Sequence, residues 1–491
     1  MRLQTTQEGR GSQLRSIWLI ALSLTFTLSL VLGGPAPARA NTPIVARAPL
    51  SEDAVPLQQS NVNLYLPSLT RYSDASYVSP FGISIYDVID NSTGLARMQT
   101  AGADLIFTNA RWIDLEPTEG AAYNFSFLDA KAAAAESVGM ELVVLFDHNP
   151  NWALINTTYP RSPIKADKYT ALVNVVSALA ARYNGNNGHP RINYWLFYGE
   201  PDNIYSGWGN NGNEYGDMLA LVSPAIKAVN SLAKVMPGAI AYERFTDDTV
   251  NAPGPFARSF LPTVLARLNT KAGGAAAYID GVGFNEFGLS PTRWPTLRDK
   301  AASVRQIMAA ANVSQLPLIV TELSRNSRGS SATETTQAQH VLKLYAQGIA
   351  SNLAQLHWFM VFDDTSQPAN LLDNYTYGLF RGTDINVPKP SYTAYLVAAR
   401  ELDGARFSRE LGVSGSEGYV FIDGPENVTV VWATSSNVNV DFTQSCARVI
   451  TRLDQVSQIS DGTAGDRDGA ANGRVRIQVT PNEPVIVRNC Q

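Results

Sequence analysis

Apolar and polar residues follow a regular pattern from Phe81 to about Gly404, in which short apolar runs are separated by longer amphipathic stretches. In the stretch 166–183, Leu172, Val176 and Leu179 recur at steps of four and three, which places them on one face of a helix. The apolar runs predict strands buried on both faces at 82–88, 104–109, 141–146, 193–198, 233–241, 278–284, 316–321 and 356–362. The amphipathic stretches predict helices at 126–138, 166–183, 214–232, 297–311, 333–350 and 390–402.

This order of strands and helices predicts an α/β fold, and two architectures share it. A doubly wound open sheet shows the same alternation as a (β/α)₈ barrel. Eight strand units, and the lack of a glycine-rich phosphate loop after the first strand, favour a TIM barrel over residues 79–403. After residue 404 the helical stretches end, and short β-type runs separated by turn residues predict a small antiparallel β-sandwich over 404–491. These runs are 419–422, 428–433, 438–442, 447–453, 474–479 and 485–487.

The first 40 residues have the pattern of a secretory signal peptide. Arg2, Arg10 and Arg15 precede an uncharged apolar run at 17–32, and small residues at Ala38 and Ala40 suit a signal peptidase. An uncleaved membrane anchor is the alternative, but the run is shorter than the ~20 residues that a spanning helix needs. We therefore expect a secreted or periplasmic protein, with no stable membrane insertion after cleavage. Residues 41–78 read as a spacer.

The composition excludes some classes of partner and cofactor. With 38 basic and 43 acidic residues the formal net charge is −5, which gives no electrostatic reason to expect nucleic acid. The four histidines are scattered and form no cluster with metal-ligand spacing, so neither a metal nor another cofactor is expected. The oligomeric state stays open. The two cysteines, Cys446 and Cys490, are predicted to form a disulfide, and two buried thiols are the alternative.

Two glutamates lie at the carboxyl ends of predicted strands, where the catalytic residues of a TIM barrel are found. Glu200 follows the predicted fourth strand and Glu322 the seventh. Strands three positions apart face each other across a closed barrel, so the two carboxyls can flank one bond at its mouth. Glycoside hydrolysis needs such a pair, one to protonate the leaving oxygen and one to attack or to activate water.

The two segments also resemble known catalytic motifs. "YWLFYGEPDN" around Glu200 is similar to the acid/base motif of the clan-A glycoside hydrolases, and "LPLIVTELS" around Glu322 is similar to their nucleophile motif. The passage 111–146, "NWA" at 151–153 and Trp358 resemble further parts of family 39 and family 5 enzymes. The resemblance covers about 81–403 and implies a retaining double displacement on a carbohydrate substrate. Glu200 would be the acid/base, with a pKa raised relative to that of the nucleophile Glu322.

The chain departs from the clan pattern at two supports of the reaction. Gly199 stands where the family has an asparagine that holds a sugar hydroxyl, and Phe287 stands where it has a tyrosine that contacts the nucleophile. Asn285 can still donate and accept a hydrogen bond, and Glu286 either replaces a missing contact or points away between strand and helix. A weakly catalytic carbohydrate-binding barrel therefore stands beside the hydrolase as a hypothesis, with a transglycosylase or a barrel of other chemistry as the third.

Other polar and aromatic residues near the predicted strand ends are candidates for substrate contact. His148 is either a sugar ligand or a hydrogen-bonded structural residue. Trp208 lies in a Gly/Asn-rich loop after the acid/base, where stacking on a sugar ring is plausible by sequence. The substrate-binding candidates are Arg111, Asp147, His148, Trp152, Asn203, Trp208, Asn285, Glu286 and Trp358.

Overall fold

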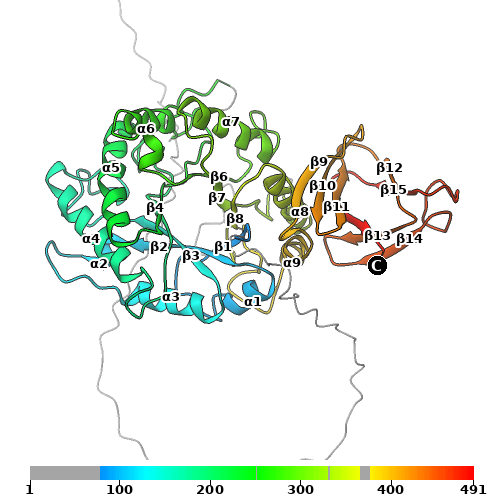
Figure 1. Ribbon diagram of the computed structural model, residues 1–491, viewed down its shortest axis with the longest axis horizontal. Helices are drawn as coiled ribbons and strands as arrows, with labels where there is room; N and C mark the ends of the chain where they lie inside the picture. The colour runs from blue at the N-terminus through cyan, green and yellow to red at the C-terminus, as the bar shows by residue number, and fades with distance from the viewer. Residues whose placement is uncertain (1–77, 250–251, 330–331, 365–375, 491) are drawn as a thin grey trace, which may run out of the picture. The chain divides into compact units, whose positions relative to one another are not determined.

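The computed structural model describes residues 78–249, 252–329, 332–364 and 376–490 (Figure 1). They belong to a compact unit, Thr70–Gln491. The predicted signal peptide and almost all of the predicted spacer lie outside these residues. Among the helices in the described ranges, none combines the length and the apolar character needed to cross a membrane.

Eight parallel strands form the barrel, and Figure 1 shows helices arranged around them. The strands are β1 (Phe81–Ser84), β2 (Leu105–Arg111), β3 (Glu141–Asp147), β4 (Tyr194–Phe197), β5 (Lys234–Pro237), β6 (Val282–Glu286), β7 (Leu318–Leu323) and β8 (Gln355–Trp358). Their order is β5-β4-β3-β2-β1-β8-β7-β6, and a parallel bridge between Ile240 and Phe284 closes the ring. Asn285 N–H donates to the Ile240 carbonyl across this closure at 2.9 Å. The predicted TIM barrel is confirmed.

The helices cover the outer face of this ring. They are α1 (Leu95–Thr100), α2 (Trp112–Leu115), α3 (Ser126–Ser137), α4 (Tyr169–Arg182), α5 (Gly212–Val229), α6 (Phe260–Asn269), α7 (Leu297–Ala310), α8 (Glu334–Ala350) and α9 (Pro390–Leu402), with 3₁₀ turns at Ala166–Lys168 and Ala275–Ala277. The sequence pattern missed α1, α2 and α6. The first two are too short to show a helical period, and α6 carries a proline in its first turn and follows the long loop after β5.

Successive side chains of each strand point alternately into the barrel and out toward the helices. Both sets are buried, so each strand is a continuous apolar run in the sequence. Phe107 and Leu145 point into the barrel, where they pack in a cluster with Leu196 and Ile319. Ile106 and its counterparts on neighbouring strands pack outward against the helices. Because each strand is buried on both faces, its middle is mostly apolar, with buried exceptions such as Thr108 and His357, and the other polar positions lie toward its ends. The ends of the strands are therefore where the chemistry must be sought.

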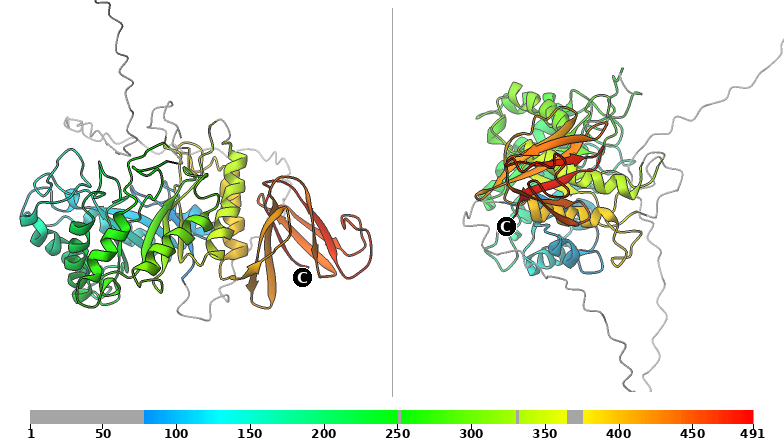
Figure 2. Two further views of the ribbon diagram at one scale, coloured as in Figure 1. Left: turned by 90° about the horizontal axis from the view of Figure 1, so that it is seen from above. Right: turned by 90° about the vertical axis from the view of Figure 1, so that its right-hand side faces the viewer.

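The C-terminal region folds as antiparallel sheets, as predicted, and Figure 2 shows its strands from two further sides. Its strands are β9 (Arg406–Glu410), β10 (Ser416–Asp423), β11 (Glu426–Ala433), β12 (Val438–Phe442), β13 (Cys446–Thr451), β14 (Val456–Ser460), β15 (Val475–Val479) and β16 (Val485–Asn489). Six form a sheet in the order β14-β13-β16-β11-β10-β9, and β12 pairs with β15. A disulfide joins Cys446 to Cys490, which confirms the predicted bridge. The pattern missed β9 and β14, which are largely exposed and carry few apolar residues.

One face of the six-stranded C-terminal sheet joins the apolar core of the barrel's outer layer, and a separate apolar cluster lies between the two C-terminal sheets. Tyr419 and Trp432 of the C-terminal sheet belong to the same cluster of buried residues as the barrel's outer layer. Polar contacts surround this core: Gln347 on α8 donates to Glu417 at 2.7 Å, and Arg488 on β16 pairs with Glu401 on α9 at 2.7 Å. The C-terminal sheet is thus packed against α8 and α9.

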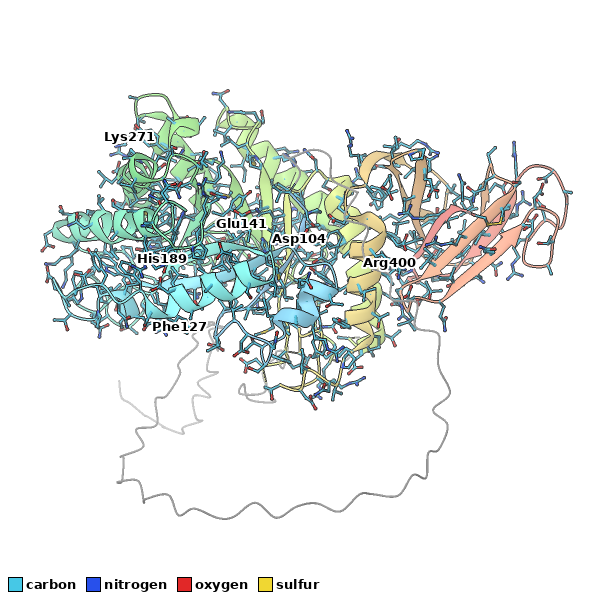
Figure 3. All side chains as sticks on the ribbon, turned by 60° about the horizontal axis from the view of Figure 1, so that its bottom comes forward. Asp104, Phe127, Glu141, His189, Lys271 and Arg400 are labelled. Carbon is cyan, nitrogen blue, oxygen red and sulfur yellow. A yellow bond between two sulfur atoms is a disulfide. The ribbon has the colours of Figure 1, made fainter. Side chains whose placement is uncertain are left out.

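Ionisable side chains also lie at the amino ends of the strands, on the face opposite to Glu200 and Glu322. Asp104 precedes β2, Glu141 begins β3 and His189 precedes β4 (Figure 3). Asn193 donates a 2.6 Å hydrogen bond to Glu141, whose pKa burial raises. In a barrel of this kind polar groups on the amino face serve stability, so we exclude them from the site.

Candidate active site

Glu200 and Glu322 meet at the carboxyl ends of their strands, and Asn285 lies between them. Glu200 follows β4 by three residues, Glu322 lies near the end of β7, and both are partly accessible. The side-chain amide nitrogen of Asn285, on β6, is 3.2 Å from Oε1 of Glu200 and 3.2 Å from Oε2 of Glu322. Thr321 Oγ1 donates to the amide oxygen of Asn285 at 2.9 Å, which turns the nitrogen toward the two carboxyls.

This shared nitrogen limits the distance between the two carboxyl groups. Two oxygens that are each 3.2 Å from one nitrogen lie at most about 6.4 Å apart. If each oxygen accepts one of the two amide N–H bonds, which diverge by roughly 120°, they lie about 5.5 Å apart. A retaining glycosidase places its carboxyls ~5–5.5 Å apart and an inverting one ~6.5–9.5 Å apart. The upper limit on the separation of these two oxygens, about 6.4 Å, lies below the inverting range.

The backbone around Glu200 is held in an unusual conformation that directs its side chain. Tyr198 and Glu200 both have left-handed backbone angles, with φ of 59° and 46°. Such strain is maintained only where neighbours fix it. Asp202 accepts hydrogen bonds at 2.9 Å from the N–H groups of Ala241 and Tyr242, which join this turn to the loop after β5. Gly238 is required there, because any side chain would collide with the Tyr198 carbonyl.

Tyr86, which sequence reasoning missed, supplies the hydroxyl that Phe287 lacks. It lies two residues after β1, and its hydroxyl donates to Oε1 of Glu322 at 2.5 Å. Phe287 instead packs against the rings of Phe359 and Tyr377, with centroids 5.4 and 5.2 Å away. The hydrogen bond to the carboxylate is thus made from a different strand. The only signal in the sequence was a tyrosine just past the end of a buried strand.

We expect Tyr86→Phe to lower kcat/KM by about 10- to 100-fold on an aryl glycoside, because a hydrogen bond to a charged group is worth about 1.5–3 kcal/mol. The loss should grow as the pH falls, since the hydrogen bond lowers the pKa of Glu322 and its removal lets that pKa rise. Phe359→Leu, which alters packing beside Tyr86 without touching the hydrogen bond, is the matched control. An unchanged pH profile in Tyr86→Phe would contradict this role.

Arg161, also missed, lies against the turn that carries Glu200, where its Cζ and Nη1 would each be 3.5 Å from a Cβ atom at Gly199. Its Nε donates to Oδ2 of Asp147 at 2.8 Å, and Nδ1 of His148 is 3.2 Å from the same oxygen. Burial would raise the pKa of Asp147, but Arg161 and His148 outweigh it and lower that pKa to about 2. The positive charge of Arg161 also lowers the pKa values of Glu200 and Glu322. The predicted candidates Asp147 and His148 therefore join the site by holding Arg161.

Burial raises the pKa of both carboxyls of the pair. For Glu322, burial and the charge of Glu200 outweigh the hydrogen bond from Tyr86 and raise the pKa to about 7. For Glu200, burial outweighs the hydrogen bond from Asn285 and the charge of Arg161. Each carboxyl therefore favours its protonated form more than a free glutamate does. Because burial acts on both groups, the pKa of Glu322 is raised along with that of Glu200, and the expected order of the two stays a prediction.

Glu286 is engaged by two cations behind the end of β6. Arg325 contacts one of its oxygens at 2.7 Å and Lys300 the other at 3.5 Å, and together they outweigh burial and lower the pKa of Glu286. An ionised carboxylate cannot donate a hydrogen bond, so Glu286 does not replace the missing tyrosine. Lys300 also donates to the Asn285 carbonyl at 2.7 Å and to Glu243 at 2.8 Å. This buried lysine fixes the strand end that carries Asn285.

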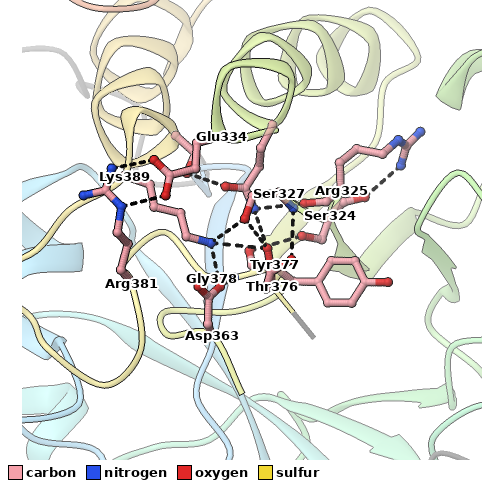
Figure 4. Close-up of polar contacts among 12 residues, drawn as sticks. Ser324, Arg325, Ser327, Glu334, Asp363, Thr376, Tyr377, Gly378, Arg381 and Lys389 are labelled. Carbon is pink, nitrogen blue, oxygen red and sulfur yellow. Dashed lines mark hydrogen bonds and ion pairs between the residues drawn. The ribbon is translucent and has the colours of Figure 1, made fainter. Parts of the chain in front are cut away.

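A polar network joins the segments that follow β7 and β8 (Figure 4). Nζ of Lys389 donates to Asp363 at 2.6 Å and to the hydroxyl of Ser327 at 2.9 Å. Asp363 also accepts a hydrogen bond from the N–H of Gly378 at 3.0 Å. Because Ser327 lies five residues after Glu322, the network holds the chain as it leaves the strand of the second carboxyl.

The remaining predicted contacts lie around the site in structural roles. Arg111 pairs with Asp114 at 3.5 Å, and Asn203 caps its own loop by accepting the N–H of Tyr205 at 2.9 Å. Trp152 donates to the Glu116 carbonyl at 3.2 Å and packs against Trp112. Trp208 and Trp358 have no exposed surface. Within the ranges that the structure describes, no three His, Cys, Asp or Glu side chains are grouped as metal ligands would be.

Comparison with known proteins bears on this geometry. No protein-family model matches the sequence, and no curated protein does. A solved family 39 glycoside hydrolase from Bacteroides cellulosilyticus WH2 superposes with a TM-score of 0.64 at 17% identity, over 84% of this chain and 81% of that chain. The same 84% of this chain matches 96% of a GH39 beta-xylosidase from Caulobacter crescentus and 96% of a GH30 endoxylanase from Clostridium papyrosolvens C71. Both have a TM-score of 0.58, at 15% and 14% identity.

The chain has the fold of the clan-A glycoside hydrolases. The expected likeness to these enzymes is thereby confirmed at the level of the fold, and the roles of the two glutamate motifs stay predictions. Identities this low do not carry an activity across, so the function must be argued from the groups at the mouth of this barrel.

Proposed function

We propose that the chain is a retaining glycoside hydrolase that cleaves O-glycosidic bonds through Glu200 and Glu322. The observation that carries the proposal is Asn285, whose one amide nitrogen reaches both carboxyls and so sets their spacing. Retention requires that spacing, because the second carboxylate must reach the anomeric carbon itself rather than act through water. The clan-A fold supports a carbohydrate substrate.

The two glutamates have different roles in the reaction. Glu200 gives its proton to the leaving oxygen while Glu322 attacks the anomeric carbon, so that a covalent glycosyl-enzyme forms and the leaving alcohol departs. Glu200, now a carboxylate, then takes a proton from water, whose oxygen displaces Glu322 from the same carbon. Glu200 is protonated again, and both carboxyls are returned to their starting states.

The electrostatics support this exchange of roles. The hydrogen bond from Tyr86 lowers the pKa of Glu322 and so favours its carboxylate form, against the effect of burial. Once Glu322 is esterified, it carries no charge. The pKa of Glu200 then falls, because a neighbouring negative charge has gone. Glu200 is thus an acid in the first step and a base in the second.

Tyr86 and Arg161 weigh against the alternative of a binding protein without turnover. Gly199 and Phe287 motivated that alternative because each removes a usual support of catalysis. Tyr86 offers a hydroxyl to Glu322, and Arg161 offers guanidinium nitrogens beside the pair. The proposal includes export of the protein, which rests on the pattern of residues 1–40 alone.

Hydrolysis of 4-nitrophenyl glycosides and of polysaccharides, xylan among them, tests the proposal, with the anomeric configuration of the first-formed sugar followed by proton NMR. We expect turnover with net retention. Inverted product would overturn the mechanism. Saturable sugar binding without turnover would favour the carbohydrate-binding alternative, and transfer to an added sugar acceptor in place of water would identify a transglycosylase.

A further inference from the structure

Arg161 is fixed beside the reacting carboxyls but uses only part of its hydrogen-bonding capacity. Its Nε is bound to the fully buried Asp147, and 23% of its side chain is accessible. Among the described residues, Nε is the only nitrogen of Arg161 that has a hydrogen-bond acceptor in reach. Its two Nη groups therefore remain as donors, and its charge acts on both Glu200 and Glu322.

The absence of a side chain at Gly199 makes room for this guanidinium. A Cβ atom at Gly199 would lie 3.5 Å from both Cζ and Nη1 of Arg161, and 3.4 Å from Leu145. An alanine would just fit at that contact distance, but any longer side chain would have to displace the guanidinium or the leucine. Gly199, which immediately precedes Glu200, thus lies against the guanidinium of Arg161, which comes from the segment after β3.

A hydrogen-bond donor at the position of Arg161 would meet one particular hydroxyl of the substrate. A sugar bond cleaved by the pair must lie between Glu200 and Glu322, and the hydroxyl next to its anomeric carbon is the one on C2. Hydrogen bonds to that hydroxyl strengthen in the transition state. We propose that Arg161 donates this hydrogen bond, and that the substrate is a neutral sugar with a free 2-hydroxyl. This inference rests on the proposed function and assigns the substrate class of the same site.

The charge balance favours a hydroxyl over a carboxylate as the group that Arg161 meets. Asp147 already neutralises the guanidinium at 2.8 Å, and the proposed mechanism keeps Glu322 as a carboxylate in the free site. An anionic sugar would therefore enter a site of its own sign. A hydroxyl needs only the donor and brings no charge.

The test compares kcat/KM for 4-nitrophenyl β-D-xyloside and β-D-glucoside with their 2-deoxy counterparts, in the wild type, Arg161→Gln and Arg161→Lys. For each enzyme, discrimination is kcat/KM for the parent glycoside divided by kcat/KM for its 2-deoxy counterpart. Dividing the wild-type value by that of the variant cancels the intrinsic reactivity of the deoxy sugars. We expect Arg161→Gln to lose about 10- to 100-fold on the parent glycoside and to lose most of the discrimination. Arg161→Lys, which keeps a cation beside Asp147, should retain part of it.

Arg182→Gln is the matched control, because Arg182 also binds an aspartate through Nε at 2.8 Å, but at the end of α4. Equal discrimination in the wild type and in folded Arg161→Gln and Arg161→Lys would overturn the assignment, as would preference for a 4-nitrophenyl glucuronide. If the wild type turns over no glycoside, the proposed function fails. In that case, calorimetry that compares the binding of xylose and glucose with the binding of their 2-deoxy forms still decides whether Arg161 binds the 2-hydroxyl.

Discussion

Replacing Glu322 with glutamine should lower kcat/KM about 10⁴-fold or more on every glycoside, because an amide oxygen is too weak a nucleophile to form the covalent intermediate. The loss should not depend on how good the leaving group is, since the bond to carbon fails to form in every case. Single-turnover kinetics with an activated aryl glycoside would measure it directly.

The same variant should be more stable than the wild type above neutral pH. Burial raises the pKa of Glu322 to about 7, so ionisation there opposes folding as the pH rises from about 4.5 through 7. Glutamine removes that cost, and we expect a gain of about 1–2 kcal/mol at pH 8 that disappears near pH 4. Denaturant titrations at the two pH values measure the difference.

Glu141→Gln is the control for the rate measurement, because Glu141 is a partly buried glutamate on the opposite face of the same barrel. It should keep its hydrogen bond from Asn193 and the wild-type rate. A Glu322→Gln protein with more than a few per cent of wild-type activity would remove Glu322 from the mechanism.

Replacing Glu200 with glutamine should produce a loss that depends on the leaving group. General acid catalysis contributes about 10²–10⁴-fold, so alkyl glycosides and polysaccharides should lose that much in kcat/KM. An aryl glycoside with an acidic phenol needs little protonation and should retain most of its first step. A plot of log kcat/KM against leaving-group pKa should therefore be steeper for the variant than for the wild type.

The pH dependence of Glu200→Gln gives an independent check. The acidic limb reports protonation of Glu322 while Glu200 still holds its proton and is uncharged, so Glu200→Gln should leave that limb in place. The alkaline limb, which reports loss of the acid's proton, should disappear. Added azide, a nucleophile that needs no general base, should accelerate the second step in the variant alone. An unchanged leaving-group dependence would assign the acid to another residue.

The barrel and its pair of glutamates could be predicted because both depend on local sequence. Strands buried on two faces leave a continuous apolar run, and Glu200 and Glu322 each end such a run within a recognisable motif. Tyr86 and Arg161 could not be predicted in the same way. Tyr86 reaches Glu322 only because β1 lies near β7 in the ring, and Arg161 is placed by a buried partner, Asp147.

The aromatic candidates show the converse limit. Trp208 and Trp358 follow strands that lead to the mouth of the barrel, yet both are fully buried. Trp358 donates to the Tyr377 carbonyl at 3.1 Å, and Trp208 packs against Tyr198 with ring centroids 5.3 Å apart. Which way a large ring points depends on the loop that folds over it, and a sequence pattern does not contain that information.

The apolar core that runs from α8 and α9 into the C-terminal sheet has a consequence for how the chain unfolds. Tyr419 and Trp432 are buried with barrel residues, and Arg488 reaches Glu401 across the same boundary. Cutting the chain after residue 403 would leave that face of the barrel in water. The barrel and the C-terminal sheet should therefore unfold in a single cooperative transition. In evolution the barrel and the sheet would be inherited or exchanged together, as one unit.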